Sequence, residues 1–315
     1  MLGRWGATSA AVILVLAATG LAWSLVGAAR APEPEGTLVC AGDVMLGRGV
    51  ARLCRERGED YPFALVAGYL QSADLAFGNL ECSLTDLSTR FPRVNALRGY
   101  PQMAPALARA GFDVLSVANN HSIDYGRRGL AHTRELLAAA GIAPVGAGAT
   151  QAEAEQGVVV TARGLRVGFL AYSRFPYLEF VRDPQRETVL GLDEETLRRT
   201  VPALARRCDV VVVSCHWGTE GVPTPDPEER ALAHLAVDLG ADLVVGHHSH
   251  VRGEVEQYRG ALIAYGLGNL VFDESRGGNE GYLLTCRLGR RGVQGYELLP
   301  VRVVQGQATP EALPQ

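Results

Sequence analysis

The sequence predicts an α/β layered fold. Short apolar runs, rich in Val, Leu and Ala, alternate with helical patterns from Thr37 onward, and this alternation is typical of sheets covered by helices. The expected buried strands are Thr37–Val44, Ala73–Asn79, Phe112–Ala118, Leu165–Tyr172, Asp209–Cys215, Leu243–Gly246 and Leu262–Tyr265. The expected helices are Tyr61–Gln71, Met103–Ala110, Gly129–Ala140, Glu194–Arg206 and Pro227–Leu239. Strand character returns over Gly281–Val304, which we expect to join a sheet late.

Several of these helices carry start and stop signals. Asp226 can cap a helix whose first residue is Pro227, and the two glutamates that follow suit the positive end of the helix dipole. Asp193, before two further glutamates, has the same character. Glycines that stop helices stand at Gly111, Gly141 and Gly240.

The first thirty residues differ from the rest. The run from Trp5 to Ala29 holds 25 residues without a charge, enough for a helix to span a hydrocarbon core of about 30 Å. Its length favours an uncleaved signal-anchor, whereas its small residues near Ala29 favour a cleaved signal peptide. Both place the following chain outside the cytoplasm. We therefore expect a targeting segment over 1–30, a stiff linker over 31–36, one domain over 37–304 and a loose tail over 305–315.

Composition excludes several classes of protein. The formal charge of −4 argues against nucleic-acid binding, and no lysine is present, so anions must be bound by arginine or backbone N–H groups. A lysine-containing phosphate loop is therefore absent, as is a G-x-S-x-G nucleophile motif. Six cysteines occur without a C-x-x-C pair, which argues against a thiolate zinc site; Cys54 and Cys82 are the one pair worth testing as a disulfide.

Polar residues follow the predicted strands at the points where they end. The residues delivered in this way are Asp43, Asn79, Glu81, Asn119, Asn120, His121, His216, His247, His248, His250, Asn269 and Asp273. Sites in open α/β sheets form outside the carboxyl ends of the strands. Each residue alone has a structural explanation, such as a turn or a buried hydrogen bond, but together they predict a metal site.

The chemistry of these residues limits the metal. Carboxylate, amide oxygen and imidazole without thiolate suit Mn, Fe, Zn or Mg. Two ions about 3.5–4 Å apart could clamp a phosphoryl or carbonyl oxygen. The sequence leaves open whether one or two ions bind.

The same segments resemble the successive motifs of the CapA family of capsule (poly-γ-glutamate) biosynthesis proteins. They are Ala41–Arg48, Gly78–Glu81, Ala118–Gly126, His216–Gly218, Gly246–Val251 and Gly268–Asp273, in the family's order, and the resemblance covers Thr37 to Leu288. That family is similar to calcineurin-like metallophosphoesterases. The resemblance therefore implies a four-layer α/β/β/α sandwich, in which two packed sheets are flanked by helices.

The resemblance also implies roles for individual residues. The implied metal ligands are Asp43, Glu81, Asn120, His216, His248 and His250. Glu81 stands where phosphoesterases have the aspartate that bridges two metals. His121 stands where they have the histidine that protonates the leaving group or steadies the transition state. Met45 replaces a histidine ligand that phosphoesterases usually carry, which puts tight binding of two ions in doubt. His247 lies outside the His-x-His match, and we interpret it as structural or as supporting a ligand.

Five further residues complete the candidate site. Asp124 could orient His121 or cap the next helix. The candidates for binding substrate are Arg48, Asn79, Arg98 and Asn269. For Arg48 and Arg98, a salt bridge or loop contact is the competing explanation.

Three functions follow as expectations. The first is a membrane-associated, extracytoplasmic metal-dependent hydrolase that acts on an anionic polymer or phosphoester during capsule synthesis. The second is a non-catalytic component that binds or exports the polymer, with capsule-synthesis membrane proteins as partners. The third is a generic metal-dependent phosphodiesterase.

Overall fold

The computed structural model describes residues 35–90, 95–175, 186–273 and 279–311. The expected targeting segment and most of the linker lie outside these residues. Within the described part of the chain, no helix is long and apolar enough to cross a membrane.

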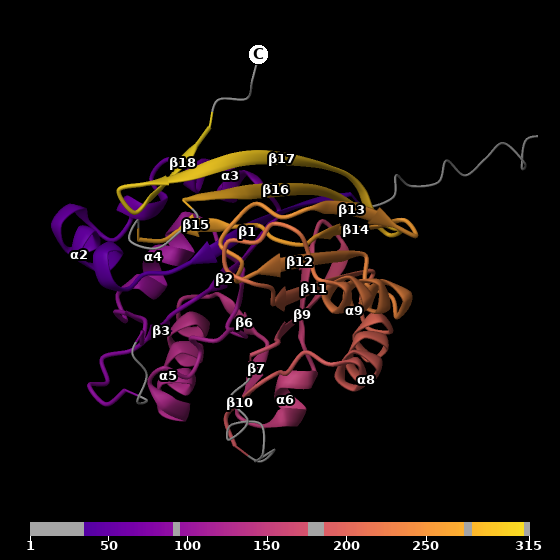
Figure 1. The fold of residues 1–315 in the computed structure, drawn as a ribbon, viewed down its shortest axis with the longest axis horizontal. Coiled ribbons are helices and arrows are strands. Elements are labelled where there is room, and N and C mark those ends of the chain that lie inside the picture. Colours follow the sequence, from indigo (N-terminus) through magenta and orange to yellow (C-terminus); the bar gives the residue numbers. More distant parts are fainter. Residues whose placement is uncertain (1–34, 91–94, 176–185, 274–278, 312–315) are drawn as a thin grey trace, which may run out of the picture. The chain divides into compact units, whose positions relative to one another are not determined.

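Two mixed sheets form the centre of the domain (Figure 1). The first has the order β18-β17-β16-β1-β2-β5-β6, with β15 also paired to β1, and the second has the order β13-β14-β12-β11-β9-β8. The strands of the first sheet are β1 (Gly36–Val44), β2 (Leu75–Leu80), β5 (Val114–Ser116), β6 (Ala143–Val145), β15 (Asn269–Val271), β16 (Glu280–Gly289), β17 (Gly292–Val304) and β18 (Gln307–Pro310). Those of the second are β8 (Val158–Ala162), β9 (Leu165–Ser173), β11 (Val210–His216), β12 (Leu243–His247), β13 (Val255–Tyr258) and β14 (Ala261–Ala264). Two small two-stranded sheets pair β3 (Ser83–Leu84) with β4 (Arg98–Gly99) and β7 (Ala147–Gly148) with β10 (Thr188–Val189).

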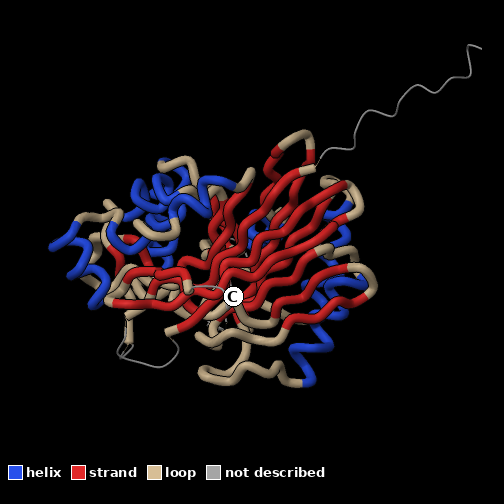
Figure 2. The backbone as a smooth tube through the Cα atoms, turned by 90° about the horizontal axis from the view of Figure 1, so that it is seen from above, coloured by secondary structure: helices blue, strands red, loops and turns tan. Residues whose placement is uncertain are grey.

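Helices cover the outer faces of both sheets. The elements are α2 (Arg48–Arg57), η1 (Tyr61–Phe63), α3 (Ala67–Ser72), α4 (Met103–Ala110), α5 (Gly126–Ala139), α6 (Gln151–Glu155), α8 (Glu194–Ala205) and α9 (Pro227–Asp238). Figure 2 shows the strands side by side with the helices gathered beside them. Alternate residues of β11 explain the layers, because Val210 and Val212 pack into the core between the sheets and Val211 and Val213 pack under α8 and α9. The predicted α/β/β/α sandwich is confirmed.

The capping signals are confirmed in detail. Asp226 accepts a hydrogen bond from the N–H of Glu229, and the Glu229 side chain accepts one from the N–H of Asp226, so both groups of a capping box are present. Asp193 caps α8 in the same sense, by accepting from the N–H of Thr196. Gly111 ends α4 in the left-handed conformation, with φ of 110°.

Three expectations are corrected. The single helix over Tyr61–Gln71 is wrong, since η1 and α3 divide it. A loose tail from residue 305 is wrong for β18, which pairs with β17 through a turn at Gln305 and Gly306, both with positive φ. A Cys54–Cys82 disulfide is wrong, because all six cysteines are free and buried.

Gly246 shows how tightly β12 approaches the chain that follows it. A Cβ atom here would lie 1.9 Å from the carbonyl oxygen of Tyr265, which accepts a hydrogen bond of 3.0 Å from Trp217 Nε1. Gly246→Ala should therefore lower the free energy of unfolding by about 3 kcal/mol, measured by urea unfolding. Gly68→Ala is the control, because nothing lies within 4 Å of its added Cβ; an equal loss in both variants would contradict the explanation.

Candidate metal centre

The candidate ligands meet at the carboxyl ends of the central strands. β1 ends beside Asp43, β2 leads to Glu81, β11 ends at His216 and β12 ends at His247. β1 pairs in parallel with β2 and β15, with Asp43 opposite both Asn79 and Asn269, while β11 pairs in parallel with β12, with His216 opposite His247. Parallel pairing in each sheet therefore delivers the side chains to one edge of the sandwich.

Two groups of side chains could each hold a metal ion. Asp43, Glu81 and His216 form one group, and Glu81, His248 and His250 form the other, with the ligand atoms of each group within 4.8 Å of one another. Glu81 belongs to both groups. His216 Nε2 also lies 3.0 Å from Asn120 Oδ1, so this amide faces the first group. All six candidate ligands are thus gathered at one place.

A test of fit is provided by buried polar atoms. Glu81 Oε2 and His248 Nδ1 are buried and have no hydrogen-bond partner among the described residues. A buried carboxylate oxygen or imidazole nitrogen without a partner is unfavourable, and a cation would satisfy both atoms. The donor set of carboxylate, amide and imidazole therefore suits a divalent metal whose identity stays open.

Electrostatics at the site agree with this fit. Burial raises the pKa of the Glu81 carboxyl well above its usual value, and the charge of Asp43 adds to the shift. Burial also opposes the ionisation of Asp43, but His247 and His250 outweigh it and hold the pKa of Asp43 well below its usual value. Burial would lower the pKa of His250, yet Glu81 and Asp43 raise it. In the metal-free site, the neighbouring Asp43 and Glu81 therefore favour the protonated form of His250.

The other two candidate imidazole ligands, His216 and His248, favour the neutral form. Burial lowers the pKa of His216 well below its usual value, and the charge of His248 adds to this. Burial lowers the pKa of His248 to about 4, with a further contribution from His250. Neutral imidazole is the form that binds a metal.

Asn79 and Asn269 contact two of the candidate ligands. Both side chains are fully buried. Asn79 Nδ2 donates to Asp43 Oδ1 at 2.8 Å, and Asn269 Oδ1 lies 3.0 Å from His250 Nδ1. Each amide therefore helps to orient a candidate ligand, and the expectation that they bind substrate stays a prediction.

Asn119 and His247 are two contributors whose roles the sequence left open. Asn119 joins the motifs, since its Nδ2 donates to Asn79 Oδ1 and its Oδ1 accepts from the N–H of His121. The ring of His247 is fully buried, with Nδ1 3.2 Å from Asp43 Oδ1 but without the geometry of a hydrogen bond. Strand periodicity could have predicted this position. His247 follows Val245 by two residues, so both side chains lie on the face of β12 between the two sheets.

His121 and Asp124 form a hydrogen-bonded pair beside the ligands. Their Nδ1 and Oδ2 atoms lie 2.7 Å apart, and Asp124 is fully buried while the His121 side chain is 11% exposed. Asp124 Oδ2 also accepts from the N–H of Leu97 at 2.7 Å, which fixes the carboxylate. Helix α5 begins at Gly126 without a side-chain cap, so the alternative of Asp124 as a helix cap is not realised.

Arg48, Arg98 and Met45 lie around this centre with their own partners. Arg48 is bound by Asp273 through two nitrogens, at 2.9 and 3.0 Å, and stacks on Phe272, whose ring packs 4.7 Å from that of His250. Arg98 donates to the carbonyl of Leu87 and lies over the rings of Tyr100 and Tyr125. Met45 is buried, and its sulfur accepts from the N–H of Gly47 at 3.0 Å. Arg48 thus makes the salt bridge, and Arg98 the loop contact, that were the competing explanations for them. Binding of an anionic substrate by either arginine stays a prediction.

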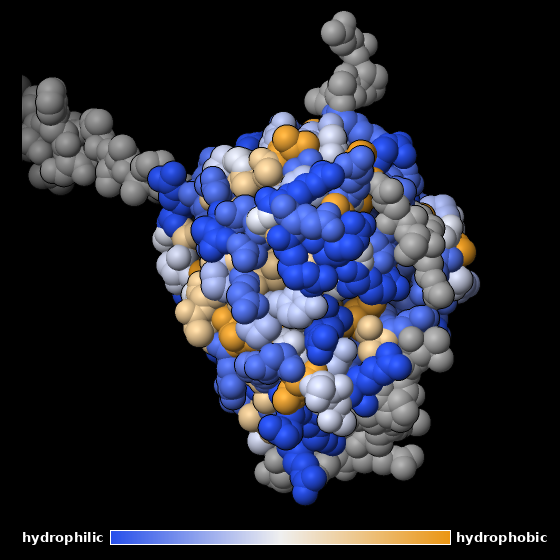
Figure 3. Space-filling view, turned by 90° about the vertical axis from the view of Figure 1, so that its left-hand side faces the viewer, coloured by the Kyte–Doolittle hydropathy of each residue, from blue (hydrophilic) through white to orange (hydrophobic). Residues whose placement is uncertain are grey.

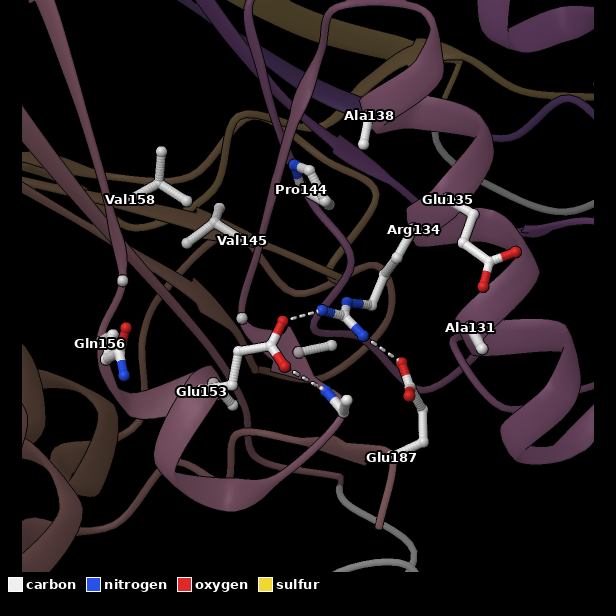
Figure 4. Close-up of a pocket in the computed structure, with 15 residues that line it drawn as sticks. Ala131, Arg134, Glu135, Ala138, Pro144, Val145, Glu153, Gln156, Val158 and Glu187 are labelled. Atoms are coloured by element: carbon white, nitrogen blue, oxygen red, sulfur yellow. Dashed lines mark hydrogen bonds and ion pairs between the residues drawn. The ribbon is translucent and has the colours of Figure 1, made fainter.

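The face shown in Figure 3, which lies beyond the carboxyl end of β1, is hydrophilic over most of its area. A separate cavity of about 450 Å³ lies between α5, α6 and β8 (Figure 4). Arg134 crosses it, paired with Glu153 on one side and Glu187 on the other. Because its guanidinium is paired with a carboxylate on each side, we interpret Arg134 as a link between elements.

The two helix-flanked sheets form a metallophosphoesterase-like fold, with the candidate ligands at one edge of it. Among solved structures, the fold is similar to a hypothetical protein from Thermus thermophilus, with a TM-score of 0.54 and 15% identity over 84% of this chain and 98% of that one. It is also similar to a 5'-nucleotidase precursor from the same organism, with a TM-score of 0.52 and 18% identity over 88% of this chain and 55% of that one.

The chain belongs to the family described as bacterial capsule synthesis protein PGA_cap, whose model matches residues 37–274. It is 30% identical to the capsule biosynthesis protein CapA of Bacillus anthracis, over 95% of this chain and 75% of that protein. It is also 30% identical to the PGA biosynthesis protein CapA of Bacillus subtilis, over 85% of this chain and 72% of that protein. The resemblance to the CapA family is confirmed.

Proposed function

We propose that this protein is a membrane-anchored, extracytoplasmic, metal-dependent hydrolase that acts on an anionic polymer or phosphoester during capsule synthesis. The observation that carries the proposal is Glu81, which is shared by two groups of ligands beside the His121–Asp124 pair. The anchor would be the uncharged run Trp5–Ala29. Homology to proteins named for capsule and PGA biosynthesis supports a polymer of γ-linked glutamate as the first substrate to test.

A divalent metal, when bound, supplies a Lewis acid that polarises a phosphoryl or carbonyl oxygen. Asp43, Glu81, Asn120, His216, His248 and His250 would hold it. His121 would deliver a proton from Nε2 to the leaving oxygen or nitrogen, because the contact of Nδ1 with Asp124 fixes the tautomer and steadies the imidazolium. Arg48 and Arg98 would hold an anionic substrate, with Arg48 exchanging part of its contact with Asp273.

A second candidate function is polymer binding without turnover. Met45 favours it, since the thioether stands where phosphoesterases carry a ligand and is turned to Gly47. A site with fewer ligands binds its metals more weakly, and a family member could keep the fold for recognition alone.

The test is metal content and turnover of the purified protein. We expect one or two transition-metal ions per chain by mass spectrometry after reconstitution with Mn, Zn or Fe, and loss of them in Asp43→Ala combined with His250→Ala. Hydrolysis of phosphodiesters or γ-linked glutamate polymer should follow the metal content. Bound polymer with bound metal and no product would favour the second candidate, and no metal under any condition would refute the hydrolase.

A further inference from the structure

Arginines gather at the end of the domain opposite the metal centre. Six exposed ones form this group, which we call the basic end: Arg163, Arg166, Arg206, Arg207, Arg290 and Arg291. They occupy the turn before β9 and the start of that strand, the turn before β11, and the turn between β16 and β17, which lies at the right in Figure 1. The molecule as a whole is acidic, with a formal charge of −4, so this concentration of positive charge is local.

Contacts show that these turns form one surface. Arg166 and Arg290 both bind Asp209 Oδ1, each at 3.1 Å. Arg163 binds Asp74, which in turn accepts from the N–H of Thr37 at 2.9 Å. The side chains of Arg163, Arg166 and Arg290 are 69%, 51% and 50% exposed.

The carboxylates at this end do not cancel the field. Asp74 and Asp209 are 22% and 11% exposed and lie beneath the guanidinium groups that they bind. Asp242 is partly buried, Glu35 is exposed, and the exposed Asp238 is paired with Arg259. No partner is present in the described ranges for Arg206 and Arg291. Outward-facing positive charge therefore exceeds negative charge on this surface.

The described chain begins at the same place. Gly36 pairs with Leu288, two residues before Arg290, and a Cβ on Gly36 would lie 4.0 Å from that of Arg163. Residues 31–36 separate the uncharged run from β1, and six extended residues span at most about 20 Å. If the run spans the membrane, as in the proposed function on which this step rests, the basic end cannot lie far from the lipid surface.

We propose that the basic end docks on anionic phospholipid headgroups and holds the metal centre away from the membrane. Guanidinium groups bind phosphate through paired hydrogen bonds, and charges within a screening length of about 10 Å add to the attraction. Asp43 is seven residues along β1 from Gly36, a rise of about 23 Å, so the centre faces the polymer side.

The test uses residues 31–315, because both sheets and both cores lie within the compact unit Pro34–Gln315. Sedimentation with vesicles should show binding to phosphatidylcholine mixed with phosphatidylglycerol, little binding to phosphatidylcholine alone, and loss of binding at high salt. Arg206→Glu combined with Arg291→Glu should weaken binding about tenfold or more. Neither side chain has a partner among the described residues, so the fold should persist, which circular dichroism checks.

The matched control is Arg52→Glu combined with Arg128→Glu, two exposed arginines elsewhere that give the same net charge. Equal weakening by both pairs, or binding that ignores phosphatidylglycerol, would overturn the proposal. The proposal would also be overturned if the protein bound polyglutamate and not vesicles, and if Arg206→Glu combined with Arg291→Glu abolished that binding. Alkaline extraction of the full chain from membranes tests the N-terminal span separately, so failure of the anchor and failure of docking are distinguishable.

Discussion

Glu81→Gln should remove metal from both groups of ligands at once. The carboxylate is shared by the Asp43–His216 group and by the His248–His250 group, and it is almost fully buried. A neutral amide supplies neither the charge nor the second oxygen that a shared position requires. We expect the affinity for Mn or Zn to fall on the order of a hundredfold or more, measured by titration calorimetry and by metal content.

After the metal is removed with a chelator, Glu81→Gln should have the opposite effect, on stability. Without metal, Glu81 Oε2 is a buried oxygen with no partner in the described chain, beside the charge of Asp43. Gln relieves that repulsion, so metal-free Glu81→Gln should unfold at the same temperature as the metal-free parent or a higher one. A purely structural glutamate would instead lose stability with or without metal.

Glu220→Gln is the matched control for this pair of measurements. Glu220 is exposed on the loop after β11 and lies close enough to raise the pKa of Glu81 through its charge. It belongs to neither group of ligands, so metal content should be preserved. If Glu220→Gln loses metal as Glu81→Gln does, the effect is one of local charge and the shared position is wrong.

The sequence predicts the sheets well because the strands are buried on both faces. Runs such as Val210–Cys215 have no solvent-facing alternation, so continuous apolar character marks them, and polar residues mark their carboxyl ends. Six candidate ligands follow from those ends. Helix α2 was not predicted, because five of its ten residues are arginine or glutamate and only Val50, Ala51 and Cys54 are buried. Such a helix depends on packing more than on a wide apolar stripe.

The residues that hydrogen-bond to the candidate ligands were harder to predict than the ligands themselves. Asn79 and Asn269 stand at strand ends like the ligands do, and only three-dimensional pairing shows that their amides are turned to Asp43 and His250. The backbone conformation at His248 and His250 was equally hard to predict, since both have positive φ, at 88° and 59°. Non-glycine residues rarely adopt this conformation, and its presence at two candidate ligands is typical of backbone strain held at a functional site.

The largest effect on turnover is expected from His121→Asn. Asn keeps a hydrogen-bond donor near Asp124 but cannot deliver a proton, so we expect a loss on the order of 10²–10⁴ in kcat with alkoxide or amine leaving groups. A nitrophenolate leaving group needs no proton, so the loss with that substrate should be much smaller. Metal content should be unchanged, because His121 belongs to neither ligand group.

Asp124→Asn separates positioning from proton delivery. The amide oxygen can still accept from the N–H of Leu97, but the ring of His121 loses the carboxylate that fixes its tautomer. Turnover should fall about 10- to 100-fold, with a shifted pH profile. His132→Asn is the control, since this histidine on α5 contacts Thr85 Oγ1 at 3.1 Å and not the site. If His121→Asn slows both leaving groups equally, His121 stabilises charge and is not the acid, because only an acid responds to the basicity of the group that departs.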